Sequence, residues 1–510
     1  MSSNDHETRR RFGGSVLAMP TDVAAVYDEV AVLIEDIRRD SDVRLSDWRA
    51  KIERPAFKHG AGNLAAYLAL RRRDLRPLQR RLMALGLSSL GRLESRVLPT
   101  LLAVRAALAA MIGQTADPIQ PDSTFFAGER KLAAQARAIF GAPRGRSPVA
   151  LLVTCPTEAA EDPEFMLELA KRRVEAIRIN CAHDDADAWA RMIGHARAAA
   201  ASTGHRMKVF MDLAGPKIRT GEVQMAGKAK KVRCGDRIAI VRLGGLGPVV
   251  AADVAPFAVE CTLPEVLGAA ALGDRVFIDD GKIAAEIERA EAWGVVARVT
   301  LARERGVRLK PERALNFPDT AVQVGALTGH DRKDLEFVAA HADAIEFSFV
   351  QTAEDVAALQ AVLAALRPDD WRTLGLVLKI ETAQAVANLP DIIIQAAGRQ
   401  PAAVMIARGD LSVEIGFART AEIQEEILWL AEAAGVPAIW ATQVLETLVK
   451  TGLPSRGEMT DAAMAARAEC VMLNKGPYLL ETIDQMQLLL RRMGANQHKK
   501  VPLLRRLRSW

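Results

Sequence analysis

Cysteine and tyrosine are scarce in this sequence, and their scarcity narrows the classes of protein to consider. Five cysteines stand at positions 155, 181, 234, 261 and 470 among 510 residues, without a CxxC pair. Scattered and odd in number, they argue against a disulfide framework or a zinc site and favour a reducing compartment. The three tyrosines are too few to interleave aromatic residues with basic ones, so we expect no nucleic-acid partner.

A long uninterrupted apolar run is also missing. The opening segment MSSNDHETRRRFGG has no apolar core, so we expect no secretory signal and a cytoplasmic location. The longest apolar region, VLPTLLAVRAALAAMIG (97–113), contains Arg105, which favours a buried or amphipathic helix over a membrane crossing. The formal net charge of +5 is mild and fits anionic small ligands as well as nucleic acid. We therefore expect a soluble globular protein with no membrane partner.

The first 145 residues predict an all-helical N-terminal domain. From the Thr-Asp pair at 21–22 onward, apolar residues recur at spacings of three and four, as on an amphipathic helix. The basic run RRRDLRPLQRR (71–81) predicts a solvated helix or loop face or, alternatively, an anion or partner site. The sequence leaves open whether this domain caps the rest, binds a partner or assembles a homo-oligomer. GAPRGRSPVA (141–150) predicts a linker.

Beyond the linker the sequence predicts an α/β fold, because short apolar runs alternate with stretches of helix length. Eight such runs, closing on themselves, predict a (β/α)8 TIM barrel over residues 146–221 and 318–495. The predicted strands are 149–154, 175–180, 207–213, 343–349, 374–380, 402–408, 436–441 and 469–474.

The long gap between the third and fourth predicted strands, residues 222–317, predicts an inserted small β-barrel lid domain. Its segments, such as GDRVFIDDGKIAAEIERA (273–290), are rich in β-branched residues and punctuated by glycine. Within it, Asp279 and Asp280 predict a tight turn with Gly281. The last residues, 496–510, form a basic tail.

Polar residues gather where the predicted strands end, the edge at which such barrels carry their active sites. Glu381 and Asp410, on adjacent strands, present the oxygen ligands that Mg²⁺ or Mn²⁺ prefers. Cationic side chains beside them would suit a phosphorylated, carboxylated substrate, since phosphoryl transfer depends mainly on positioning and charge neutralisation. The residues at these ends are Arg178, Asn180, Asp212, Lys379, Glu381, Arg408, Gly409, Asp410, Thr442 and Gln443.

Five segments give the chain a specific resemblance to the pyruvate kinase family. They are MDLAGPKIRTG (211–221), FIDDGKI (277–283), LKIETAQAVANL (378–389), VMIARGDLSVEI (404–415) and IWATQVLETLVKTGLPSRGEMTD (439–461). The resemblance extends from about residue 150 to 485. It implies transfer of phosphate from phosphoenolpyruvate to ADP, which yields ATP and pyruvate.

Carried over residue by residue, the resemblance implies roles for the polar strand ends. Lys379 would stabilise phosphoryl transfer and the enolate, and Glu381 and Asp410 would hold Mg²⁺ or Mn²⁺. Gly409 and Thr442 would line the phosphoenolpyruvate pocket, with Thr442 and Lys379 among the catalytic residues.

The resemblance also implies a nucleotide side of the site. Arg178, the third catalytic residue, would bind substrate and face the transferred phosphate, while Asn180, His183 and Arg219 would bind ADP or ATP. His183 could equally be an ordinary loop histidine.

Three departures from the family pattern carry expectations of their own. Ala182 replaces a serine that helps hold potassium, and Lys217 replaces a glutamate, so its ammonium would stand in for the monovalent cation beside Asn180 and Asp212. We therefore expect activity without potassium. The loop LNKGPYLLETI (473–483) is shorter than in the family, which could impair turnover or change the substrate.

Other interpretations stay open at this point. Lys379 and Glu381 could be a structural ion pair at a barrel rim. The protein could be a catalytically impaired sensor or scaffold that binds phosphoenolpyruvate or nucleotide. A third interpretation is a metal-dependent lyase that acts on a pyruvate enolate, because barrels of this kind reuse enolate chemistry.

Overall fold

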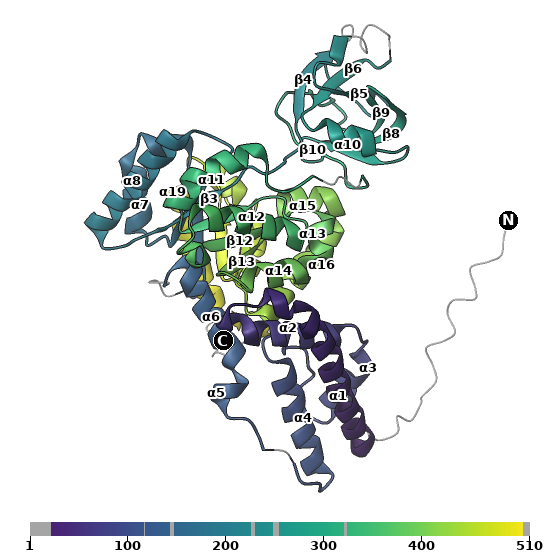
Figure 1. Cartoon of the computed structure of the whole chain (residues 1–510), viewed down its shortest axis with the longest axis vertical. Coiled ribbons are helices and arrows are strands. Elements are labelled where there is room, and N and C mark those ends of the chain that lie inside the picture. Colours follow the sequence, from purple (N-terminus) through teal and green to yellow (C-terminus); the bar gives the residue numbers. More distant parts are fainter. Residues whose placement is uncertain are drawn as a thin grey trace, which may run out of the picture.

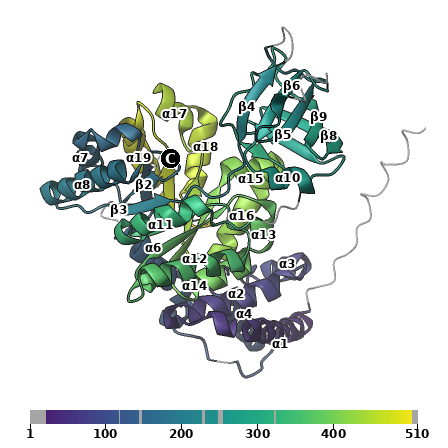
Figure 2. The ribbon, with the colours of Figure 1, turned by 45° about the horizontal axis from the view of Figure 1, so that its top comes forward.

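The computed structural model of the chain has three parts arranged along one axis (Figure 1). N-terminal helices lie at one end, a barrel lies in the middle, and a β-rich insert lies at the other end. The insert lies beside α15 (Arg408–Ile415) and away from α1 (Val23–Trp48) (Figure 2). The structure describes residues 22–116, 118–142, 147–225, 230–247, 254–320 and 324–502. The predicted linker residues 143–146 and the ends 1–21 and 503–510 lie outside these ranges.

The middle part is a closed barrel of parallel strands, which confirms the predicted α/β barrel. The strands are mainly apolar and mostly buried, as expected of parallel strands covered on both faces. Around the barrel the strand order is β1, β2, β3, β11, β12, β13, β14 and β15. These are β1 (Ala150–Thr154), β2 (Ala176–Asn180), β3 (Lys208–Asp212), β11 (Ala344–Phe347), β12 (Gly375–Ile380), β13 (Ala402–Ala407), β14 (Ala438–Ala441) and β15 (Cys470–Leu473).

Helices connect consecutive barrel strands and cover the outside of the barrel. Some begin at clear sequence signals: Thr328 and Thr352 each form a capping box with an aspartate three residues later. Others end at glycine in the left-handed conformation, as at Gly204 and Gly435. The connecting helices are α7 (Pro163–Lys171), α8 (Ala186–Thr203), α11 (Gly329–His341), α12 (Ala353–Leu366), α13 (Ala383–Ala387), α14 (Leu389–Ala397), α15, α16 (Phe417–Ala434), α17 (Glu446–Thr451) and α18 (Arg456–Ala465), and α19 (Leu479–Gly494) follows the last barrel strand.

The N-terminal helices close the bottom of the barrel, where the strands begin. Phe140, the last residue of α6 (Ala127–Phe140), is 1% exposed and stacks on Phe210 inside the barrel, with ring centroids 5.9 Å apart. Trp48, which ends α1 (Val23–Trp48), donates a hydrogen bond to Asp391 on α14 (2.7 Å). Gly60 of α2 (Lys58–Arg71) lies so close to α16 that a Cβ there would stand 2.0 Å from a backbone oxygen.

The remaining helices of this part are α3 (Arg76–Ala84), α4 (Val97–Met111) and α5 (Asp122–Phe125). The apolar region around Arg105 is α4, a partly buried helix, and no helix among the described residues is long and apolar enough to cross a membrane. Two arginines of the basic run make ion pairs with acidic residues of α1: Arg73 pairs with Asp40 (2.9 Å) and Arg81 with Glu29. These contacts favour the interpretation of the basic run as a structural helix face.

The insert between β3 and β11 has its own sheet and its own apolar core, which includes Ile238, Phe257, Ile283 and Val295. Its hydrogen-bonded order runs β10-β7-β8-β9-β5-β6-β4, and closure into a small barrel stays a prediction. The positive φ angles of residues 279–281 confirm the tight turn between β7 and β8. The elements are β4 (Thr220–Met225), β5 (Arg237–Arg242), β6 (Phe257–Cys261), α10 (Pro264–Ala269), β7 (Arg275–Ile278), β8 (Ile283–Glu291), β9 (Gly294–Leu301) and β10 (Leu315–Asn316).

The described part of the basic tail packs against the rest of the molecule. It forms two short antiparallel strands, β16 (Gln497–His498) and β17 (Val501–Pro502). Between them, Lys499 pairs with Glu469, the residue before β15, and Lys500 pairs with Glu94 of the N-terminal part. The tail therefore helps to join the N-terminal helices to the barrel.

Candidate active site

The interior of the barrel changes from apolar to charged where the strands end. Successive side chains on a strand alternate faces, so a residue two positions after an interior residue also faces inward. Apolar interior side chains include Ala176, Phe210, Ala344 and Val377. The residues two positions later are Arg178 on β2, Asp212 on β3, Glu346 on β11 and Lys379 on β12.

Lys379 is the centre of a buried cluster of charges. Its Nζ lies 3.0 Å from Asp212 Oδ1, 2.6 Å from Ser348 Oγ and 3.4 Å from Glu381 Oε1. The side chains of Lys379, Asp212 and Glu381 are 10%, 3% and 4% exposed. The lysine and glutamate that stand two positions apart in the sequence therefore lie side by side, facing an aspartate from a distant strand.

Arg178 is held in the same cluster by three of its nitrogens. Nε donates a hydrogen bond to Glu346 Oε2 (3.0 Å), and Nη1 donates to Thr154 Oγ1 (3.1 Å). Nη2 forms an ion pair with Asp212. Asp212 thus bridges Arg178 and Lys379, and it faces Glu346 across the β3–β11 pair.

The protonation states in this cluster follow from burial and neighbouring charge. Burial alone would lower the pKa of Lys379, but Asp212 and Glu381 outweigh it and raise that pKa above its ordinary value. Burial opposes ionisation of Asp212, yet Lys379 and Arg178 bring its pKa below the usual range. Burial, reinforced by Asp212, raises the pKa of Glu346. The Lys379–Asp212–Arg178 bridge is therefore charged near neutral pH.

Glu381 and Asp410 lie close enough to interact, on neighbouring strand ends. Burial, with the charge of Asp410 adding to it, raises the pKa of Glu381. Glu381 Oε2 accepts a hydrogen bond from the backbone N of Phe349 (2.6 Å). Lys217, in the segment that enters the insert, lies 2.8 Å and 3.0 Å from the two carboxylate oxygens of Asp410.

These two carboxylates fit the predicted Mg²⁺ or Mn²⁺ in the chemistry of their donors. Magnesium is usually held by one or two carboxylates together with waters and substrate oxygens. No group of three or more His, Cys, Asp or Glu side chains arranged for a metal occurs among the described residues. The Glu381–Asp410 pair thus suits a metal that is also coordinated by a substrate. For such a metal to bind, Lys217 must break its hydrogen bond to at least one oxygen of Asp410.

Gly409 and Thr442 meet beside this pair. A Cβ at position 409 would lie 2.8 Å from Thr442 Cγ2, so a side chain there would collide with the threonine. Thr442 has φ +66, an unfavourable conformation for a β-branched residue. Arg408 holds it there by donating to the Thr442 backbone oxygen (2.6 Å) and pairing with Asp461.

The residues predicted for the nucleotide side are brought together only in part. Asn180 and His183 line an open cleft with Arg178 at the ends of β1 and β2, and Lys475 of the shortened loop lines it too. Arg219 lies in the segment that enters the insert. Its backbone N donates to Thr262 Oγ1 (2.9 Å) and its guanidinium donates to the backbone oxygen of residue 312 (3.4 Å).

Two of the three residues predicted for the monovalent-cation position, Asn180 and Asp212, are register partners on β2 and β3, whereas Lys217 contacts another residue. Asp212 bonds Arg178 and Lys379, and the Asn180 side chain accepts a hydrogen bond from the backbone N of residue 182 (3.1 Å). Lys217 contacts Asp410 instead and lies 5.9 Å from the Phe349 ring.

Two residues of the cluster, Glu346 and Ser348, were absent from the predicted site. Both lie in DAIEFSF (343–349), the fourth predicted strand. Their signal is the alternation itself: Ala344, Glu346 and Ser348 share one face, and a carboxylate on the interior face of an apolar strand indicates a buried partner.

Comparison with known proteins identifies the family of the barrel. The family model described as "Pyruvate kinase, barrel domain" matches residues 150–483. The pyruvate kinase of Geobacillus stearothermophilus is 30% identical over 351 residues, which is 67% of this chain and 57% of the relative. That of Methylorubrum extorquens is 31% identical over 338 residues, 64% of this chain and 65% of the relative. That of Agrobacterium vitis is 29% identical over 364 residues, 69% of this chain and 70% of the relative.

The match leaves the N-terminal helices outside the family model. The chain spans less than two thirds of the length of the first two relatives. The match nevertheless includes every strand of the closed barrel and every charged residue of the buried cluster. On this evidence the chain belongs to the pyruvate kinase family.

Proposed function

We propose that the chain is a metal-dependent phosphotransferase that converts phosphoenolpyruvate and ADP into pyruvate and ATP. The observation that carries the proposal is the buried bridge of Arg178, Asp212 and Lys379 beside the carboxylates of Glu381 and Asp410. In phosphoryl transfer a protein contributes mainly positioning and charge stabilisation, and this cluster offers fixed charges of both signs at the barrel edge.

Lys379 is the residue that would stabilise the transferring group. An ammonium has three N–H donors, and Asp212 and Ser348 hold two of them at 3.0 Å and 2.6 Å. The third faces Glu381 Oε1 at 3.4 Å, a weak contact that a substrate oxygen can replace. Lys379 would then donate to the bridging oxygen of phosphoenolpyruvate as the P–O bond breaks and negative charge develops on the enolate.

The remaining residues would place the two substrates. Glu381 and Asp410 would hold Mg²⁺ or Mn²⁺, which would supply Lewis-acid stabilisation of the phosphoryl and carboxylate oxygens. Thr442 and Gly409 would line the phosphoenolpyruvate pocket, and Arg178 would contact the phosphate that moves to the β-phosphate oxygen of ADP. The enolate left behind takes up a proton at carbon to give pyruvate.

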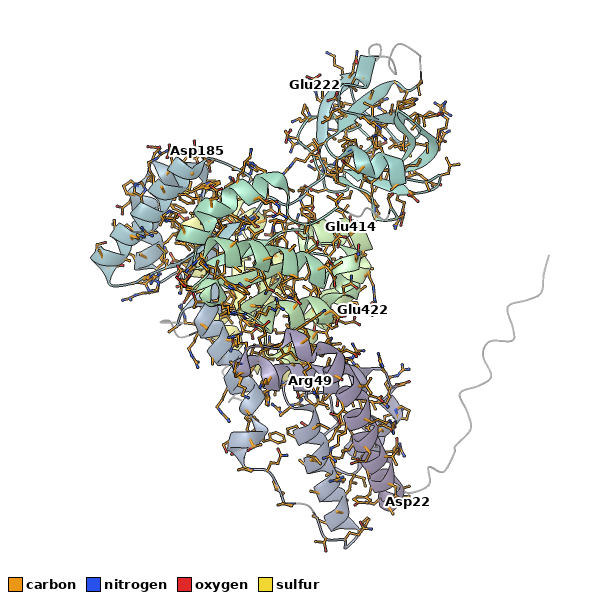
Figure 3. All side chains as sticks on the ribbon, viewed as in Figure 1. Asp22, Arg49, Asp185, Glu222, Glu414 and Glu422 are labelled. Atoms are coloured by element: carbon orange, nitrogen blue, oxygen red, sulfur yellow. The ribbon has the colours of Figure 1, made fainter. Side chains whose placement is uncertain are left out.

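The insert would serve as a lid over this pocket. Residues at both ends of the insert contact α15: Lys217, just before the insert, pairs with Asp410, and Asn316 of β10 donates a hydrogen bond to Glu414 (3.4 Å). Glu414 lies on the edge of the barrel that faces the insert (Figure 3). Arg219 and His183 would reach the nucleotide on lid closure.

The same proposal includes a cytoplasmic location and a division of the chain into four parts. These are a helical domain (1–145), the barrel (146–221 and 318–495), the lid (222–317) and a basic tail (496–510).

A coupled assay for pyruvate formation from phosphoenolpyruvate and ADP tests the proposal, run with Mg²⁺ and with or without potassium. We expect turnover that does not need potassium and that falls by at least about a hundredfold in Lys379→Met, as for the loss of a transition-state donor. Lys208→Met is the matched control, because Lys208 also lies on a barrel strand but pairs with Asp343 at the opposite end (3.0 Å).

The other outcomes separate the alternatives. Turnover only with potassium would keep the phosphotransferase and exclude Lys217 as a cation substitute. Binding of phosphoenolpyruvate or ADP without turnover would favour the sensor or scaffold, for which the shortened loop 473–483 is the specific observation. Pyruvate release without ATP formation would indicate the lyase.

A further inference from the structure

Glu346 is an unusual residue for its position inside the barrel. It is 0% exposed, and the neighbouring interior residue on the same strand is Ala344. Its Oε2 accepts from Arg178 Nε, whereas its Oε1 has no hydrogen-bond partner among the described residues. A buried carboxylate with an unpaired oxygen costs stability, and an apolar side chain of similar volume would cost less. Packing therefore does not explain Glu346, and its contact with Arg178 is the remaining reason.

The contact matters because of how the donors of Arg178 are distributed. A guanidinium carries five N–H groups. The described structure uses one on Nε with Glu346, one on Nη1 with Thr154 and one on Nη2 with Asp212. One N–H on each terminal nitrogen is left without an acceptor among the described residues, and each can donate to an oxygen of a phosphate or carboxylate.

We propose that Glu346 is a positioning residue that fixes Arg178 so that its two remaining N–H groups are presented as a rigid fork to an oxyanion of the substrate. Two acceptors from different strands, Glu346 on Nε and Asp212 on Nη2, hold the Arg178 guanidinium in place before substrate arrives. Binding of the substrate oxyanion then depends on the direction of the two N–H groups, and the hydrogen bond from Arg178 Nε to Glu346 sets that direction. Without that anchor only the Thr154 and Asp212 contacts hold the guanidinium, and its plane can rotate about the last bonds of the side chain. The inference rests on the proposed function, since it assigns the oxyanion to phosphoenolpyruvate.

Two substitutions at one position separate the anchor from the charge. Glu346→Gln keeps an oxygen that accepts from Nε, whereas Glu346→Leu fills similar space with no acceptor. We expect Glu346→Leu to raise the KM for phosphoenolpyruvate by about tenfold to a hundredfold, the range for losing a hydrogen bond to a charged group. We expect Glu346→Gln to stay within about threefold of the parent and kcat to change less than KM in both variants, because Lys379 is untouched.

The matched control is Glu175→Leu. Glu175 is also buried, at 8% exposure, but lies at the opposite end of the barrel, where it accepts from the backbone N of Leu151 (2.9 Å). It controls for the general effect of removing a buried carboxylate, and its KM should equal that of the parent. Circular dichroism shows whether Glu346→Leu is folded like the parent protein. If it is not, Glu346→Met replaces it, because a flexible thioether fills irregular space.

Binding of phosphoenolpyruvate with Mg²⁺, measured by calorimetry on the same variants, completes the test. Active parent protein with an unchanged KM and affinity in Glu346→Leu would overturn the positioning role and leave the proposed function intact. An equal loss in Glu346→Leu and Glu346→Gln would also overturn it, because the acceptor would not be what matters. A parent chain that neither turns over nor binds phosphoenolpyruvate would remove the proposed function, and the inference with it.

Discussion

The ion pair between Lys217 and Asp410 makes a quantitative prediction about metal binding. Lys217 Nζ contacts both oxygens of the Asp410 carboxylate, at 2.8 Å and 3.0 Å, and the side chains are 25% and 16% exposed. An ammonium and a divalent cation cannot share these oxygens without repulsion, so the metal must displace Lys217 from at least one of them. At least one of the two Lys217–Asp410 hydrogen bonds is therefore lost whenever the metal binds.

The size of that loss sets the expected effect of removing the lysine. A hydrogen bond between charged groups contributes about 1.5–3 kcal/mol when it is partly buried. Because about 1.4 kcal/mol corresponds to a factor of ten in a dissociation constant, we expect Lys217→Met to tighten Mn²⁺ binding by about tenfold to a hundredfold. Calorimetric titration with Mn²⁺ alone, without substrate, measures this directly.

The control must remove the same charge elsewhere. Lys282→Met does so, because Lys282 pairs with Asp279 within the insert (2.9 Å) and not with Asp410. Asp410→Asn should abolish the site in the parent and in Lys217→Met alike. Equal Mn²⁺ affinity in Lys217→Met and Lys282→Met would refute the competition, and unchanged affinity in Asp410→Asn would show that Asp410 is not a ligand.

Two further predictions concern stability. Phe140 fills the bottom of the barrel, so Phe140→Ala should lower the free energy of unfolding by about 3–5 kcal/mol, as for a buried aromatic residue. Phe417→Ala, at an exposed position, is the control. A midpoint of denaturation in Phe140→Ala no lower than in the control would contradict this prediction. Burial raises the pKa of Glu175 from 4.5 to about 7. Between these pH values the folded state holds a proton that the unfolded chain releases. The free energy of unfolding therefore falls as pH rises from about 4.5 to about 7, by an amount of the order of 3 kcal/mol. Chemical denaturation at several pH values should show a shallower fall in Glu175→Gln, and an equal fall in both proteins would exclude Glu175 as a source of the pH dependence.

The sequence alone identified the barrel and most of its polar edge. The apolar runs are short, separated by helix-length segments and ended by polar residues, so both the strands and their ends could be predicted. The proximity of Lys379 and Glu381 was equally predictable, because residues two positions apart on a strand share a face. Glu346 could have been found by the same rule, since it shares a face with Ala344.

The tertiary structure decided which polar residues contact one another. Asp212 lies between Arg178 of the preceding strand and Lys379, which is 167 positions away in sequence, because barrel closure brings β3 close to β12. Lys217 likewise contacts a residue 193 positions away. Local patterns carry no information about such pairings, which depend on the register and closure of the whole barrel. For the same reason, the sequence could not show that Phe140 closes the barrel from below: an amphipathic helix shows which face is apolar but not what that face will contact.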